Sequence, residues 1–222
     1  MVPIPAFLLD SPRRAVPLTG IAGPSASGKS TLTRAFLARA PWAATHLSLD
    51  FYYRDLSQIP PEERARSNFD CPAALETELL RVHLLELAAG RAIQAPVYDF
   101  HTHSRTGTQD IQPPELVVVE GILLLAIESI RSLFDLTVYV DTPSSICLQR
   151  RIQRDQEERG RSRMDITRQY VTTVLPMMKR YVHPSQVHAG MVLDGMRPPD
   201  ELAGILVRAV SPIMRAFQER GR

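Results

Sequence analysis

The amino-acid sequence predicts an α/β fold, in which a doubly wound parallel sheet carries helices on both faces. Short apolar segments rich in β-branched residues alternate with stretches of helical periodicity, a pattern typical of parallel sheets. The chain has 222 residues, 44% of them hydrophobic and 23% charged, so it is long enough to bury such a core. Ligands of such sheets bind beyond the carboxyl ends of the strands. We therefore look for functional residues at strand ends.

The first expected strand, residues 18–22, leads through a glycine-containing loop into an expected helix at 30–39. The other strands are expected at 46–49, 116–119 and 136–140, with a weaker one at 190–193. Their apolar runs suit strands that are covered on both faces. The other helices are expected at 73–89, 123–133, 144–158, 165–181 and 199–218, the last with Leu202, Ile205, Leu206 and Ala209 at core spacing.

Two segments interrupt this alternation. Residues 51–72 are polar and turn-rich, and loops of that length commonly bind ligands or close over a site. Residues 95–107 alternate aromatic and polar side chains and predict a β-hairpin lobe beside the sheet. We expect both to hold a second substrate. Because prolines near the start prevent a helix, residues 1–15 are expected to be a loosely ordered extension and residues 16–222 a single domain.

Composition excludes several classes of protein. The formal net charge of +2 is too small to predict a nucleic-acid partner. The longest apolar stretch, residues 116–127, is shorter than a membrane span and contains Glu120, so we expect no membrane insertion. The two cysteines, Cys71 and Cys147, make no disulfide framework or metal motif, which favours a reducing, cytoplasmic location.

Residues 23–30, Gly-Pro-Ser-Ala-Ser-Gly-Lys-Ser, fit the pattern G-x-x-x-x-G-K-[ST] of the phosphate-binding P-loop. The glycines let backbone N–H groups surround phosphate oxygens, and the N-terminus of the following helix favours negative charge. Lys29 would reach the β- and γ-phosphates, and the hydroxyl of Ser30 would bind Mg²⁺. The motif therefore predicts that a nucleoside triphosphate binds with Mg²⁺ at Gly23, Ser25, Ala26, Ser27, Gly28, Lys29, Ser30 and Thr31.

Two carboxylates end predicted strands beside this loop. Asp50 follows the strand at 46–49, where it could bind Mg²⁺ or accept a proton from an attacking hydroxyl. Glu120 ends the strand at 116–119, where a Walker B-type acid would hold Mg²⁺ directly or through water. Asp141 also ends a strand, but there we expect the N-cap of the next helix.

A cluster of arginines lies between positions 150 and 163, at Arg150, Arg151, Arg154, Arg159, Arg161 and Arg163. A solvated helix balanced by Asp155, Glu157 and Glu158 would explain them without any function. Phosphoryl transfer, however, needs cations over the γ-phosphoryl oxygens, and an arginine-rich lid supplies them when it closes. We therefore expect several of these arginines to bind phosphate.

The histidines of the predicted hairpin, His101 and His103, could suggest a metal site together with Asp99. Two histidines are too few for a closed zinc site. We favour a polar contact to a planar substrate that Tyr98 and Phe100 frame.

Several blocks of the sequence resemble the uridine kinase (uridine-cytidine kinase) family of P-loop kinases. They are GPSASGKST at 23–31, LSLDFYY at 47–53, NFD at 68–70, PVYDFHTHSR at 96–105, VVEGIL at 118–123, YVDT at 139–142, RRIQRDQEERGR at 150–161 and QY at 169–170. The blocks at 96–105 and 150–161 separate this family from its phosphoribulokinase and pantothenate kinase relatives. The resemblance implies transfer of the γ-phosphoryl of ATP or GTP to the 5′-hydroxyl of uridine or cytidine in pyrimidine salvage.

The same resemblance implies roles for individual residues. Asp50 matches the catalytic acid near the 5′-hydroxyl, and Ser30 and Glu120 match positions that bind Mg²⁺. The residues that match contacts to the nucleoside are Tyr53, Asp70, Tyr98, Phe100, His103, Arg151 and Gln169. The residues that match the lid over the phosphates are Arg154, Arg159 and Arg161. The expected catalytic residues are thus Lys29, Asp50, Arg154 and Arg161.

The chain departs from the family pattern at residues 71–76 and at Ser162, where many members have aspartate. These departures lie outside the residues assigned to chemistry, so they concern the packing of the loops rather than the reaction. Because family members are commonly tetramers inhibited by CTP and UTP, the resemblance also implies a homotetramer with feedback inhibition. Two alternatives stay open. One is a sibling kinase for another small alcohol, of the pantothenate or ribulose 5-phosphate type, and the other is a P-loop protein that senses nucleotides without turnover.

Overall fold

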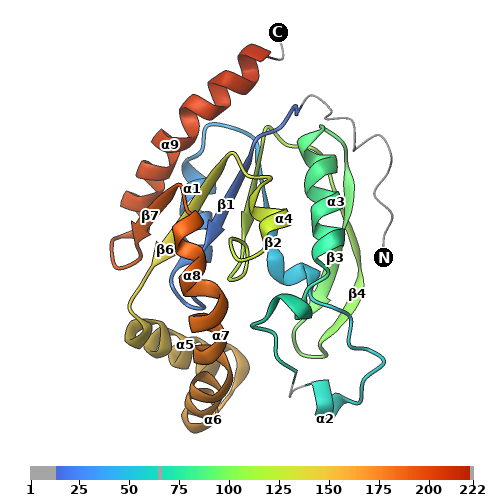
Figure 1. The fold of residues 1–222 in the computed structure, drawn as a ribbon, viewed down its shortest axis with the longest axis vertical. Coiled ribbons are helices and arrows are strands. Elements are labelled where there is room, and N and C mark those ends of the chain that lie inside the picture. Colours follow the sequence, from blue (N-terminus) through green and yellow to red (C-terminus); the bar gives the residue numbers. More distant parts are fainter. Residues whose placement is uncertain (1–13, 65–66, 221–222) are drawn as a thin grey trace.

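The computed structural model describes residues 14–64 and 67–220, except for the side chains of Pro61 and Arg159. Its centre is a five-stranded parallel sheet in the order β2-β5-β1-β6-β7 (Figure 1). The strands are β1 (Leu18–Ala22), β2 (Ala44–Ser48), β5 (Leu116–Glu120), β6 (Leu136–Asp141) and β7 (Met191–Asp194). The predicted doubly wound parallel sheet is therefore confirmed.

Helices cover both faces of the sheet, as predicted. On one face α1 (Lys29–Arg39) and α9 (Pro199–Arg220) pack through Phe36 and Leu206 against residues of β1, β5 and β6. On the other face α3 (Thr77–Ala88) and the helical stretch from 163 to 188 join one cluster of buried side chains. Burial of these apolar side chains, each worth about 1.5–3 kcal/mol, stabilises the layered arrangement.

The carboxyl ends of the central strands lie level with one another, which positions the functional residues. In the register of the sheet Ser48 of β2 pairs with Glu120 of β5, and Glu120 also pairs with Ile21 of β1. A short 3₁₀ turn, η2 (Leu49–Tyr52), follows β2 directly. Gly121 follows β5, and a side chain at that position would lie 2.3 Å from the Cβ of Leu49. Only glycine lets the two chains approach so closely.

Two lobes extend beyond these strand ends (Figure 1). One contains the hairpin of β3 (Ile93–Asp99) and β4 (Ser104–Ile111) with α2 (Pro61–Arg64) and the 3₁₀ turn η3 (Pro72–Ala74). The other contains α5 (Ser144–Arg159) and α6 (Arg163–Gln169). The predicted hairpin is confirmed but is longer than residues 95–107. Of the predicted extension, residues 1–13 lie outside the described residues, and a single domain over 16–222 stays a prediction.

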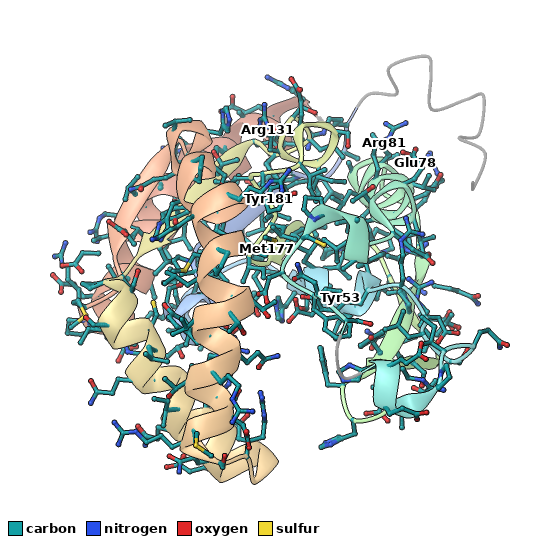
Figure 2. The ribbon with its side chains drawn as sticks, turned by 60° about the horizontal axis from the view of Figure 1, so that its bottom comes forward. Tyr53, Glu78, Arg81, Arg131, Met177 and Tyr181 are labelled. Atoms are coloured by element: carbon teal, nitrogen blue, oxygen red, sulfur yellow. The ribbon has the colours of Figure 1, made fainter. Side chains whose placement is uncertain are left out.

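Residues 163–188 form one long helical stretch, which Figure 2 shows beside the lobe that carries Tyr53. After α6 it continues through two π-helical turns and short pieces of helix: η4 (Tyr170–Val174), α7 (Leu175–Met177), η5 (Met178–Val182), α8 (His183–Ser185) and the 3₁₀ turn η6 (Gln186–His188). Each π-turn ends two residues before a proline, Pro176 or Pro184. Proline lacks an N–H and displaces the carbonyl one turn earlier, which accounts for the wider turns.

Three local predictions were wrong. The helix predicted at 73–89 begins only at Thr77, because Pro72 starts a separate 3₁₀ turn. The helix predicted at 123–133 is a series of turns followed by α4 (Glu128–Arg131). Leu123, Leu124 and Leu125 are all fully buried, so their apolar run reflects burial on every side rather than one helical face. Asp141 does not cap α5, whose N-cap is Pro143 without a side-chain hydrogen bond.

Within the described residues no helix is long and apolar enough to span a membrane.

Candidate active site

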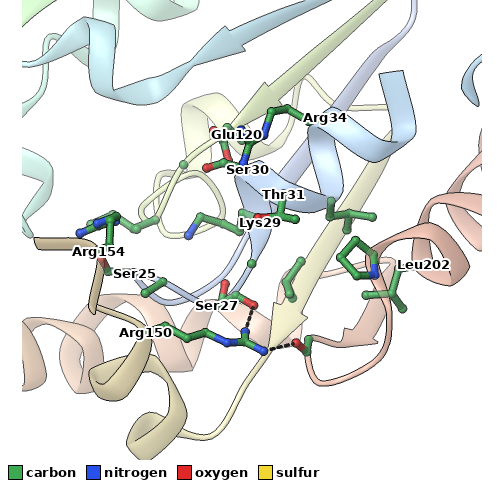
Figure 3. Close-up of a pocket in the computed structure, with 18 of the residues that line it drawn as sticks. Ser25, Ser27, Lys29, Ser30, Thr31, Arg34, Glu120, Arg150, Arg154 and Leu202 are labelled. Atoms are coloured by element: carbon green, nitrogen blue, oxygen red, sulfur yellow. Dashed lines mark hydrogen bonds between the residues drawn. The ribbon is translucent and has the colours of Figure 1, made fainter. Parts of the chain in front are cut away.

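A cavity of about 940 Å³ lies at the carboxyl ends of β1, β2 and β5 (Figure 3). The P-loop forms its floor, and Asp50 and Glu120 line it from the strand ends. Arg150 and Arg154 reach it from α5. Residues 195–199, which connect β7 to α9, complete the wall. The residues predicted at the strand ends thus line one cavity. The sequence analysis missed the contribution of residues 195–199 to its wall.

The P-loop takes a conformation that depends on its glycines. Gly23 and Gly28 have φ angles of 144° and 103°, in the left-handed region that glycine adopts without strain. A side chain at Gly23 would lie 2.4 Å from the carbonyl oxygen of Val140. Ala26 also has a positive φ, 62°. The loop leads into α1 at Lys29, so the backbone N–H groups of the first helical turn face the place where phosphates bind in such loops.

Lys29 lies in the middle of the cavity (Figure 3). Its ammonium donates a hydrogen bond to the carbonyl of Pro24 at 2.7 Å, and its side chain is buried. Burial lowers the pKa of Lys29, against the opposing effect of the charges on Glu120 and Asp50. The lysine is therefore held between two carboxylates beside the loop, where it can meet a phosphate that carries further negative charge.

Glu120 and Ser30 form an oxygen-rich pair that could hold Mg²⁺. The Ser30 hydroxyl donates to Oε2 of Glu120 at 2.9 Å, and Nε2 of His46 lies 3.3 Å from Oε1. Burial would raise the pKa of Glu120, but the contact with His46, the charge of Lys29 and the hydrogen bond from Ser30 hold that pKa below its usual value. Hard oxygen donors of this kind suit Mg²⁺. Sequence reasoning missed His46, which it treated only as the first residue of a strand.

Asp50 lies in η2, where the Ser48 hydroxyl accepts a hydrogen bond from the Asp50 N–H at 3.2 Å. Its carboxylate lines the cavity, and its charge adds to the effect of burial in raising the pKa of the nearby Tyr53. Burial raises the pKa of Asp50 to about 6, and the nearby charge of Glu120 adds to this while Lys29 opposes it. Such a carboxylate can accept a proton near neutral pH. Asp50, Glu120 and Lys29 all line the same cavity.

Aromatic side chains from three separate segments meet next to Asp50. The Tyr53 ring contacts Phe69 and Tyr98, with centroids 5.2 and 5.6 Å apart. The rings of Phe69 and His103 stack at 4.7 Å, and Phe100 packs edge-on against Tyr98 at 5.3 Å. Four of these residues were predicted for a planar substrate. Phe69 was missed, although it lies in the NFD block that carries the resemblance.

This aromatic cluster offers polar groups as well as rings. Tyr98 is buried, yet its hydroxyl has no hydrogen-bond partner within the described part of the chain. A buried, unpaired hydroxyl costs about 1–3 kcal/mol, so its presence favours a ligand that pairs with it. Asp70 lies close by, and burial raises its pKa while the charge of Arg151 opposes that rise.

Arg151 connects the P-loop to the lobe of α5 and α6. It is 8% exposed and donates to the Ser25 hydroxyl at 3.1 Å and to Oε1 of Gln169 at 3.3 Å. Arg161 donates to the same Gln169 oxygen at 2.8 Å. Two predicted nucleoside contacts, Arg151 and Gln169, thus lie together with a predicted lid arginine. None of these three side chains lines the large cavity.

The other arginines differ in their contacts. Arg154 lines the cavity, as expected of a residue that would bind phosphate. Arg150 also lines the cavity, and it donates to the backbone carbonyls of Ser27 at 3.3 Å and Gly195 at 3.2 Å, which connects the P-loop to the 195–199 segment (Figure 3). The prediction for Arg159 concerns a side chain outside the described residues.

The acids of α5 are not all surface residues. Asp155 is fully buried and forms ion pairs with Arg151, Arg154 and Arg161. The alternative explanation of the cluster, a solvated and charge-balanced helix face, therefore does not hold for Asp155. Its position on α5 could not distinguish it from its exposed neighbours Glu157 and Glu158, because burial there depends on how α6 packs.

Known proteins are similar to this chain in sequence or in fold. Residues 18–200 match the phosphoribulokinase / uridine kinase family. A uridine kinase of Brevibacillus brevis is 42% identical over 178 residues, which cover 79% of this chain and 83% of that protein. A uridine kinase of Alkaliphilus metalliredigens is 39% identical over 198 residues, covering 88% and 95%. Phosphoribulokinase from Rhodobacter spheroides has the same fold, with a TM-score of 0.62 at 17% identity, covering 85% of this chain and 75% of that one.

Proposed function

This chain belongs to the phosphoribulokinase / uridine kinase family, and we propose that it is a kinase that transfers the γ-phosphoryl group of ATP to the 5′-hydroxyl of uridine or cytidine. The observation that carries the proposal is the position of Asp50. Its carboxylate lines the P-loop cavity and at the same time adds to the effect of burial in raising the pKa of Tyr53, which belongs to the aromatic cluster. One acid thus lies between a phosphate site and a site for a planar ring.

The residues of the cavity fit the reaction step by step. Asp50 accepts the proton of the 5′-hydroxyl as its oxygen attacks the γ-phosphorus, the bond to the β-phosphate oxygen breaks, and ADP and a nucleoside monophosphate result. Lys29 and Arg154 stabilise the negative charge on the transferred group. Ser30 and Glu120, with Asp50 nearby, would hold Mg²⁺, which when bound neutralises charge on the β- and γ-phosphate oxygens.

The nucleoside would occupy the space next to Asp50. We propose that Tyr53, Phe69 and Tyr98 surround the pyrimidine ring, which prefers edge-on or offset contacts with aromatic side chains. Asp70 and Arg151 would hold the ribose hydroxyls. We infer that Gln169 orients Arg151 toward the substrate, since it already accepts a hydrogen bond from that guanidinium.

Measuring ADP release with a panel of acceptors tests the proposal. We expect turnover with uridine and cytidine in the presence of Mg²⁺ and ATP, and none with pantothenate or ribulose 5-phosphate. Turnover of one of those alcohols without turnover of either nucleoside would favour a sibling kinase. ATP binding in a calorimetric titration without turnover of any acceptor would favour a nucleotide sensor. The same assay with GTP determines the range of phosphate donors.

We further propose that the enzyme acts in cytoplasmic pyrimidine salvage as a homotetramer inhibited by CTP and UTP. Resemblance to the family is the support for these properties. Light scattering on the purified protein tests the tetramer, and addition of CTP to the ADP-release assay tests the inhibition.

A further inference from the structure

One buried carboxylate lies at the centre of the arginine cluster. Asp155 is in α5 and its side chain has no solvent exposure. Its Oδ1 accepts hydrogen bonds from Nε and Nη2 of Arg154 at 2.9 and 2.8 Å. Its Oδ2 lies 3.4 Å from Nη1 of Arg161 and 3.7 Å from Nε of Arg151. The backbone carbonyl of Asp155 also accepts a hydrogen bond from the Arg161 N–H.

Three arginines of the described residues gather around this single carboxylate as ion-pair partners. A buried carboxylate without such partners would be strongly destabilising, so these arginines allow Asp155 to be buried as an ion. In return, the buried carboxylate restricts where the guanidinium groups can lie.

The three arginines reach different parts of the site. Arg154 lines the P-loop cavity, and its charge influences the pKa of both Lys29 and Asp50. Arg151 contacts Ser25 of the P-loop, and Arg161 reaches Gln169 at the end of α6. Asp155 is the group that these side chains share. It therefore connects the P-loop, α5 and α6 without itself lining the cavity.

We propose that Asp155 is a positioning residue, which holds the guanidinium of Arg154 in the arrangement that receives the transferred phosphoryl group. The inference rests on the proposed phosphoryl transfer. Arginine side chains carry about 2 kcal/mol of rotamer entropy, and fixing them before the reaction removes that cost from the transition state. Nε and Nη2 of Arg154 face Asp155, while Nη1 makes no hydrogen bond within the described residues. One guanidinium can thus hold Asp155 and a phosphate oxygen together.

A double-mutant cycle between Asp155 and Arg154 tests this role. We expect Asp155→Asn to lower kcat by ~10-fold or more while the KM for nucleoside stays within ~2-fold. Arg154→Ala should lower kcat by ~10²- to 10³-fold, and the double variant should be nearly as active as Arg154→Ala alone. Glu157→Gln is the matched control, because Glu157 is exposed on the same helix and accepts a hydrogen bond from Gln153, away from the arginines. Its kcat should not change.

The proposal would be overturned if the two reductions in kcat multiplied in the double variant, or if kcat were unchanged in Asp155→Asn. A purely structural role would lower the melting temperature without this coupling. Arg154→Lys provides a second test that does not disturb a buried residue, because the Arg154 side chain is 34% exposed. Lysine keeps the charge but lacks the fork that reaches two anions at once, so we expect kcat to fall by ~10-fold or more. Activity equal to the native enzyme would also overturn the proposal.

The test separates this inference from the proposed function. Turnover of uridine by the native protein, measured first, decides the function. The ratios of kcat between the variants and the native enzyme decide the role of Asp155. They can be measured with whichever acceptor the native enzyme phosphorylates.

Discussion

Replacing Asp50 by asparagine should inactivate the enzyme and make its ligand-free form more stable. Burial raises the pKa of Asp50 from 3.8 to about 6 in the folded protein. A shift of about two pKa units corresponds to roughly 3 kcal/mol, which the ionised carboxylate costs the folded state at pH 8. Because Asp50 is only partly shielded from solvent and also faces Lys29, we expect a smaller gain of ~1–2 kcal/mol from the neutral amide.

The direction of the pKa shift determines how the stability difference between Asp50→Asn and the native protein depends on pH. Since the folded-state pKa is the higher one, protonation of Asp50 stabilises the fold, fully below pH about 4, and this stabilisation is lost as the pH rises through about 6. The neutral amide of the variant would mimic the protonated acid at every pH. The advantage of Asp50→Asn should therefore be greatest at pH 7–8 and disappear near pH 4.

Thermal unfolding of the metal-free, ligand-free protein measures the effect. At about pH 8 the melting temperature of Asp50→Asn should exceed that of the native protein by ~2–8 °C, while kcat falls by at least ~10²-fold. Asp141→Asn is the control, because Asp141 also ends a strand of the sheet, β6, but is exposed. An equal or lower melting temperature at pH 8, or the same difference at pH 4.5, would refute the argument from a buried charge.

Lys29→Ala should abolish turnover and leave the circular dichroism spectrum unchanged, because this side chain lines the P-loop cavity and belongs to neither hydrophobic cluster. His46→Leu should raise the KM for Mg²⁺ by ~10-fold or more and weaken Mn²⁺ binding measured by electron paramagnetic resonance, whereas His46→Gln keeps a donor to Glu120 and should change neither. His103→Gln and His103→Tyr should each change the ratio of kcat/KM for uridine and cytidine by ~10-fold or more, because neutral imidazole can donate or accept while the replacements fix another pattern.

Each of these variants has an outcome that contradicts its reasoning. Normal kcat in Lys29→Ala would remove the P-loop cavity from the reaction. Equal metal binding in His46→Leu and the native protein would leave His46 without influence on Glu120. An unchanged nucleoside ratio in both His103 variants, with lower activity on each substrate, would make His103 a packing residue of the hairpin.

The fold could be predicted from the sequence where local pattern and burial agree. The apolar runs at 18–22 and 116–119 are fully buried strands, and α9 spans the predicted range 199–218. Of its predicted core residues, Leu202 and Leu206 are buried, whereas Ile205 and Ala209 are half-buried. The prediction was wrong at 123–133, where consecutive leucines are buried by neighbouring elements rather than by one helical face. Periodicity cannot distinguish these two cases, because it records which residues are apolar and not what surrounds them.

The site was predictable to the extent that it lies at strand ends or within a motif. The P-loop, Asp50 and Glu120 meet in one cavity because parallel strands end at the same edge. His46, Asp155 and the 195–199 segment enter the site through tertiary packing, and no spacing in the sequence indicates that. Gly195 illustrates this, since a side chain there would lie 2.0 Å from the Thr142 hydroxyl, a contact between distant parts of the chain.

The most direct measurement is the chemical identity of the product. Incubation with uridine, Mg²⁺ and ATP, followed by ³¹P and ¹H NMR, should show a phosphate ester at the 5′-carbon, with one ADP formed for each UMP. 5′-Deoxyuridine, which lacks the attacking hydroxyl, should bind without being phosphorylated and should inhibit turnover of uridine. Phosphate on a 2′- or 3′-oxygen, ester formation with 5′-deoxyuridine, or release of inorganic phosphate in place of UMP would contradict the proposed reaction.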